Sequence, residues 1–133
     1  MANWDDVRSL ALALPETTED TSGHTGRPQW RVKGKGFAWE RPLRKADLEA
    51  LGDAAPDGPI LGVRVADVGV KEALLAEDAG VYFTTPHFDG YPAILVRLPA
   101  IAVPDLTELL EEAWLVQAPK RLGKAYLAEH PPG

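Results

Sequence analysis

The spacing of apolar residues along the chain predicts five helices. In residues 3–14 they recur at the helical period of about 3.6, Asn3 can cap the first turn, and Pro15 ends the segment. The same period predicts further helices over residues 45–51, 70–77, 105–118 and 120–129. Asp105 is the expected N-cap of the fourth helix, with Glu108 at the capping-box position.

Alternation of apolar and polar residues predicts a hairpin over residues 27–41. Its turn is expected at Gly34-Lys35-Gly36, between two short aromatic runs. If the alternation continues through both strands, one face collects the large side chains and the other the cations. The expected buried residues of this hairpin are Trp30, Val32, Phe37 and Trp39.

Three other segments have the composition of strands. Residues 60–65 predict a single strand, and residues 81–85 and 93–98 flank an Asp-Gly turn in a second hairpin. Residues 16–26 show no periodicity and are interpreted as a loop, with a short edge strand as the alternative.

Together these elements predict one α+β domain spanning residues 1–133. Its antiparallel sheet consists of two hairpins plus an extra strand, with helices packed on one face. The length of 133 residues suits a single hydrophobic core, and 45% hydrophobic residues with four Trp can fill it.

Charge separates the first hairpin from the rest of the chain. Residues 27–45 contain seven Lys or Arg and one acid, whereas the whole chain has a net charge of −6. A basic hairpin can place ammonium and guanidinium groups along a phosphate chain. The residues expected to contact nucleic acid are Arg27, Arg31, Lys33, Lys35, Arg41 and Lys45. The alternative is a solvated strand face whose cations shield the sheet edge.

The turn of the second hairpin is the other candidate surface. Residues 84–91 carry His87, Phe88 and Tyr91, and aromatic side chains at a loop can stack on a base or fill a pocket of a partner protein. The opposing interpretation is that the two rings fold back onto the sheet.

The sequence disfavours an enzyme and a metal site. It has no Cys, and neither His24 nor His87 stands in a metal-ligand spacing. No cofactor is therefore expected. The acidic residues near the first helix are interpreted as a solvated face, namely Asp5, Asp6, Glu16, Glu19 and Asp20. Without a leader-like or membrane-spanning segment, we expect a cytoplasmic protein that does not enter membranes.

Four segments together resemble the MmcQ/YjbR family of small bacterial proteins. They are Ala13-Leu14-Pro15-Glu16, the hairpin 28–38, the element 82–88 and Trp114-Leu115-Val116. The resemblance implies a CyaY-like α+β fold, and it implies DNA binding because the hairpins of the family are compared with paired wings. We therefore predict a monomeric, non-enzymatic module that binds DNA through the basic hairpin. The alternative is a protein-interaction adaptor that uses residues 84–91.

Overall fold

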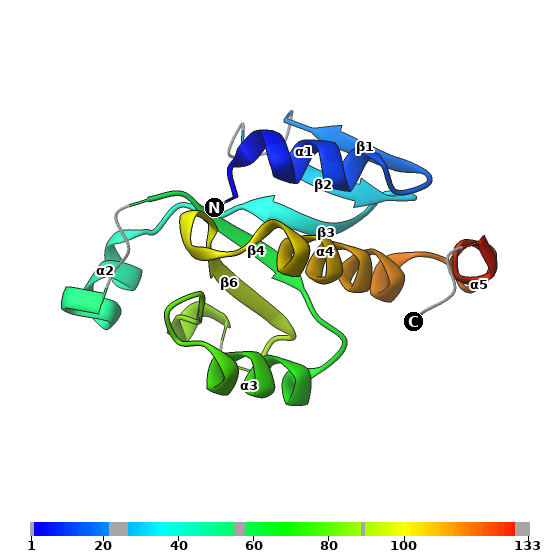
Figure 1. Ribbon diagram of the computed structural model, residues 1–133. Coiled ribbons are helices and arrows are strands. Elements are labelled where there is room, and N and C mark those ends of the chain that lie inside the picture. Colours follow the sequence, from blue (N-terminus) through cyan, green and yellow to red (C-terminus); the bar gives the residue numbers. More distant parts are fainter. Residues whose placement is uncertain (1, 22–26, 55–57, 89, 130–133) are drawn as a thin grey trace.

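A six-stranded antiparallel sheet forms the centre of the molecule (Figure 1), in the order β1-β2-β3-β4-β6-β5. The computed structural model describes residues 2–21, 27–54, 58–88 and 90–129. The strands are β1 Thr17–Asp20, β2 Gln29–Val32, β3 Lys35–Glu40, β4 Ile60–Arg64, β5 Tyr82–Phe83 and β6 Ala93–Arg97. The α+β prediction is confirmed, and the segment after the first helix forms the short edge strand β1.

The described residues also form five α-helices and three 3-10 turns, and α1, α3 and α4 contact the strands of the sheet directly. The helices are α1 Trp4–Leu12, α2 Lys45–Leu51, α3 Val68–Glu77, α4 Val103–Gln117 and α5 Lys120–Glu129. The 3-10 turns are Gly52–Ala54, Pro86–Phe88 and Leu98–Ala100. Figure 1 shows α1 and α4 lying together over one face of the sheet, and both elements contact each other. Among the described residues, no helix combines the length and apolar character needed to span a bilayer.

The helix ends test the capping predictions. Asn3 accepts a hydrogen bond from the Asp6 amide at 3.0 Å, and the Asp6 carboxylate accepts one from the Asn3 amide at 3.0 Å, so the first helix has a full capping box. The prediction for α4 is wrong, because the helix begins at Val103 and its N-cap is Ala102. Pro104 explains the early start, since proline fits the first turn, where its missing amide costs no hydrogen bond.

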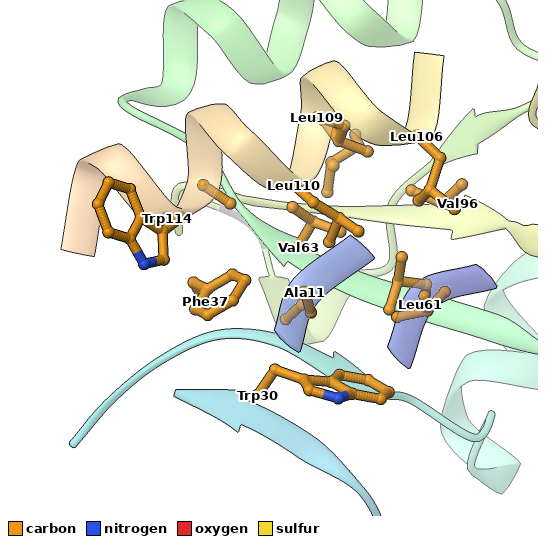
Figure 2. Close-up of a cluster of buried hydrophobic side chains, with 14 of the residues drawn as sticks. Ala11, Trp30, Phe37, Leu61, Val63, Val96, Leu106, Leu109, Leu110 and Trp114 are labelled. Carbon is orange, nitrogen blue, oxygen red and sulfur yellow. The ribbon is translucent and has the colours of Figure 1, made fainter. Parts of the chain in front are cut away.

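The main core lies between the sheet and helices α1, α3 and α4. Figure 2 shows Trp30, Phe37 and Leu61 in the same buried cluster as Trp114 of α4, and all four side chains are at most 1% exposed. The two indoles also satisfy their polar atoms: Trp114 Nε1 donates to the Pro15 carbonyl and Trp30 Nε1 donates to Glu19, each at 3.0 Å. Full burial of one such side chain stabilises the fold by about 1.5–3 kcal/mol.

The turn between β2 and β3 differs from the prediction. Lys33 and Gly34 both have positive φ angles, 50° and 84°, and Val32 pairs with Lys35. Two central residues with positive φ match the twist of the flanking strands. The tip is therefore Lys33-Gly34, and Lys35 already belongs to β3.

A bulge in β3 corrects the prediction for Trp39. Trp30 pairs with Ala38 and Arg31 pairs with Gly36, so Phe37 is an extra residue in β3. An extra residue reverses the alternation of side chains beyond it. Phe37 and Ala38 both reach the main core, whereas Trp39 packs on a second hydrophobic cluster.

This second cluster lies on the opposite face of the sheet. Alternate residues of β4 and β6 divide between the faces, with Leu61 and Val96 in the main core and Ile60 and Leu95 in the second cluster. Phe83, Phe88 and Ala93 complete the buried set, and Leu51 of α2 packs against it. The second face is thus covered by a short helix and a loop, which leaves room for a cleft.

Candidate ligand cleft

A cleft of about 500 Å³ opens on the second face of the sheet. The first hairpin, the segment leading into α2 and the end of the second hairpin form its walls. Three of its lining residues are arginines, Arg27, Arg41 and Arg44, and three are aromatic, Trp39, Phe88 and Tyr91. Glu40 is the single acid of the lining. The cleft therefore combines positive charge with ring surfaces.

Trp39 reaches the cleft because the bulge turns it outward and β4 leaves room for its indole. Its ring lies against Gly62, where a Cβ atom would stand only 2.3 Å from Trp39 Nε1. Any larger residue at this position of β4 would collide with the ring. The glycine is thus required by the close approach of Trp39.

A buried lysine of α3 fixes the aromatic loop at the end of the second hairpin. Lys71 is 5% exposed, and its Nζ donates to the carbonyl of Phe88 at 2.5 Å and to that of Tyr91 at 3.1 Å. These charge-assisted hydrogen bonds offset the cost of burying the ammonium group. Phe88 is consequently buried at 8% exposure, while Tyr91 stands 46% exposed at the cleft.

Arg41 forms part of the cleft wall and is itself buried. Its Nη2 lies 3.0 Å from Asp47 Oδ2, its Nη1 donates to the Pro42 carbonyl, and its guanidinium lies over the Phe88 ring at 5.2 Å from the centroid. Burial raises the pKa of Asp47, but the Arg44 amide and the Arg41 charge outweigh that effect and hold the pKa below its ordinary value.

Three of the predicted nucleic-acid contacts form ion pairs at the surface. Arg27 lies 3.6 Å from Glu40, Arg31 lies 3.8 Å from Asp20, and Lys33 lies 3.5 Å from Glu16. Two of the acidic residues near the first helix, Glu16 and Asp20, thus pair with cations of the hairpin rather than forming only a solvated face. Such exposed pairs each contribute at most about 1 kcal/mol, so a stronger ligand can displace them.

The remaining predicted cations lie outside the lining of the cleft. Lys35 and Lys45 are exposed, and neither forms an ion pair with another described residue. The structure brings together Arg27 and Arg41 from the predicted basic set and Phe88 and Tyr91 from the predicted loop. Part of each predicted surface therefore lines the same cleft, whereas Arg31, Lys33, Lys35 and Lys45 lie outside its lining.

Two residues that form or support the cleft were not predicted from the sequence. Arg44 was counted in the basic run but not proposed as a contact, and Lys71 sits in a helix where a solvated lysine is the ordinary expectation. The side chain of His87 and all of His24 lie outside the part of the chain that the structure describes. Among the described residues, no group of three or more potential metal ligands comes together.

Comparison with known proteins gives consistent results. The family model described as YjbR matches residues 12–116. Uncharacterised proteins of Mycobacterium bovis and Mycobacterium tuberculosis are 59% identical to this chain over 131 residues, which is 96% of this chain and 98% of theirs. The crystal structure of Deinococcus radiodurans protein DR2400 is similar in fold, with a TM-score of 0.68 at 22% identity, covering 97% of this chain and 88% of that one.

Proposed function

The chain belongs to the YjbR family, and from that premise we propose that it is a non-enzymatic module that binds single-stranded DNA in the cleft. One observation carries the proposal: three arginines and three aromatic rings line the same hollow. Single strands are bound where cations follow the phosphates and rings stack on the bases. Arg27 and Arg44 supply the accessible cations, and Tyr91 supplies the exposed ring.

The charge distribution favours a short single strand over a duplex. The net charge of −6 repels a long polyanion, and Arg31 and Lys33 of the first hairpin are already paired with Asp20 and Glu16. A few nucleotides confined to the cleft would meet the arginines without approaching the acidic remainder of the surface. Stacking on one aromatic residue contributes about 1–3 kcal/mol per base and does not depend on a duplex groove.

Removing charge from the cleft tests this function. We would titrate a fluorescent oligothymidine at low salt with the double variant Arg27→Gln, Arg44→Gln and measure anisotropy. The expected result is an affinity at least about tenfold lower than that of the natural chain and a shallower salt dependence, by about 0.7 in slope for each lost phosphate contact. Tyr91→Ala should weaken binding by about 1–3 kcal/mol, and Tyr91→Phe should preserve it.

A matched control keeps the net charge constant between variants. Lys120→Gln with Lys124→Gln removes the same charge from exposed positions of α5, away from the cleft. If this control loses as much affinity as the cleft variant, binding is diffuse and the assignment to the cleft is wrong. Absence of saturable binding at low salt would reject nucleic-acid binding altogether.

A second candidate function is protein interaction through the aromatic loop. The observation in its favour is Tyr91, a large ring 46% exposed beside the buried Phe88, because interface anchors are often such residues. A defined protein complex that persists after nuclease treatment, is lost in Tyr91→Ala and is retained in the double arginine variant would favour this function over DNA binding.

A further inference from the structure

Of the described residues that line the cleft, Glu40 alone is acidic. It is the last residue of β3, and its side chain is 23% exposed. A carboxylate repels the phosphates of a nucleic acid, so Glu40 lowers the affinity of a cleft that binds strands through charge alone. Its presence among the arginines is useful to a strand only if the carboxylate contacts a base.

The ion pair with Arg27 leaves the Glu40 carboxylate able to accept hydrogen bonds. Arg27 Nη1 and Glu40 Oε2 lie 3.6 Å apart, whereas a charge-assisted hydrogen bond is about 2.7–2.9 Å long. No other described cation pairs with this carboxylate. The Asp47 carboxylate differs, because it accepts from Arg41 Nη2 at 3.0 Å and from the Arg44 amide at 2.9 Å. Asp47 is thus satisfied within the fold, and Glu40 retains two acceptor oxygens for a ligand.

The backbone holds Glu40 at the cleft. Its amide donates to the Pro28 carbonyl at 3.0 Å, and it pairs with Leu61 in the neighbouring strand β4. A strand that enters the cleft displaces water from the carboxylate. A desolvated carboxylate without a donor costs free energy, whereas donors on the ligand offset that cost. The base next to Glu40 is therefore selected by the hydrogen-bond donors that it presents.

The donor pattern of the bases identifies the best match. Unpaired bases expose their Watson–Crick edges to side chains. Guanine carries two adjacent donors there, N1–H and N2–H, while adenine and cytosine carry an amino group beside an acceptor nitrogen, and thymine carries one N–H between two carbonyl oxygens. Two adjacent donors fit the two oxygens of one carboxylate.

We propose that Glu40 gives the cleft a preference for guanine. Its two oxygens accept from guanine N1–H and N2–H, while the purine ring stacks on Tyr91, which is 46% exposed and lines the same cleft. The inference rests on the proposed binding of single strands, and it assigns the phosphates to the arginines and the choice of base to Glu40.

Short strands that differ at one base test the preference. Each has about five nucleotides, with thymidines around a central guanosine, inosine, adenosine or thymidine, and anisotropy at low salt gives the affinity. The natural chain should bind the guanosine strand at least about fivefold more tightly than the adenosine strand, because both purines stack but only guanine presents two donors. Inosine lacks the N2 amino group, so its strand should bind with an intermediate affinity.

Glu40→Gln should change the four affinities in different directions. The variant lacks the paired acceptor oxygens, so the preference for guanosine over adenosine should fall below about twofold. It also lacks a charge that repels phosphate, so it should bind the thymidine strand more tightly than the natural chain does. The ratio of two affinities measured on one variant does not depend on the fraction of the protein that is folded.

Glu49→Gln is the matched control, because it removes the same charge from an exposed position of α2 outside the lining of the cleft. It should keep the full preference for guanosine. Equal affinity of the natural chain for all four strands, or an unchanged preference in Glu40→Gln, would overturn the role of Glu40 and leave the proposed function intact, since the strands still bind. Absence of saturable binding by every strand would reject both.

Discussion

The cleft and a second hollow of about 230 Å³ differ in how far their charges are compensated by neighbouring residues. We call the second hollow the acidic pocket, because its lining includes Glu77, Asp78, Asp105, Glu108 and Glu112. In the cleft, Arg41 is buried against Asp47 and Arg27 lies beside Glu40. In the acidic pocket, five carboxylates stand together without a described counter-charge. The basic run that dominates the sequence is therefore the better compensated of the two regions. A count of charges along a chain does not show which charges are available to a ligand.

The two regions also differ in whether their charged side chains hold elements of the fold together. Arg41 is an element of structure, because it joins the first hairpin to α2 and supports the Phe88 ring. Among the described residues, the Glu77 carboxylate forms no ion pair, and the Asp78 carboxylate accepts one hydrogen bond, from the Gly80 amide at 2.9 Å. Removing a charge that is paired in the cleft should therefore lower the free energy of unfolding, whereas removing a carboxylate of the acidic pocket should raise it.

The largest expected effect comes from Asp47→Ala. The substitution leaves the Arg41 guanidinium buried without its counter-charge, and it removes the acceptor of the Arg44 amide at 2.9 Å. Breaking a buried ion pair in this way costs about 3–5 kcal/mol. Urea unfolding measures the loss, with the exposed Asp53→Ala as control. A loss below about 1 kcal/mol would show that Arg41 is solvated and would remove the contrast with the acidic pocket.

The dependence on pH follows from the same pair. Since the fold lowers the pKa of Asp47, its contribution is present above the unfolded carboxyl pKa of about 3.9 and is lost as the pH falls through the folded value. Asp47→Ala should lack this part of the acid-induced loss of stability.

Gly62→Ala is expected to have the next largest effect. The added Cβ would stand 2.3 Å from Trp39 Nε1 and 2.4 Å from Cε2, so the indole must leave its position in the cleft. Such overpacking costs about 1–3 kcal/mol, and the tryptophan emission should shift with the change in environment. Gly36→Ala is a suitable control, because its Cβ would meet only Gln29 Oε1 at an ordinary 3.5 Å. Unchanged stability and emission in the Gly62 variant would contradict the packing described for the cleft.

The smallest effect should have the opposite sign. Glu77→Gln removes one negative charge from the C-terminal end of α3, where no basic residue balances it. The free energy of unfolding should rise by about 0.3–1 kcal/mol at low ionic strength and return toward the natural value as salt screens the charges. Glu72→Gln, in the middle of α3, should change the free energy of unfolding less than Glu77→Gln does. A destabilised Glu77 variant would indicate that this carboxylate has a structural partner.

Local signals made much of the fold predictable. Asn3 and Asp6 cap one helix within a few residues, and the helix over residues 45–51 ends at Gly52, whose φ angle of 56° suits glycine. Strand β4 was expected at residues 60–65 and lies at Ile60–Arg64. These elements are determined by residues close to one another in the sequence, so the local pattern of residue types is enough to predict them.

The cleft could not be predicted because it depends on distant contacts. Phe37, Ala38 and Trp39 are consecutive apolar residues, so alternation alone cannot place the bulge among them. Lys71 bonds to carbonyls 17 and 20 residues away, and its burial leaves no trace in the helical pattern. The pairing of Arg31 with Asp20 likewise depends on β1 joining the edge of the sheet.

Because of the bulge, β3 contributes consecutive residues to two different hydrophobic clusters. Phe37 and Ala38 pack in the main core, whereas Trp39, two residues beyond Phe37, packs on the second cluster on the cleft side of the sheet. A substitution of Trp39 therefore changes the lining of the cleft, while Phe37 and Ala38 stay in the main core. The lining of the cleft can vary in this architecture while the main core is kept, because adjacent residues of β3 belong to different hydrophobic clusters.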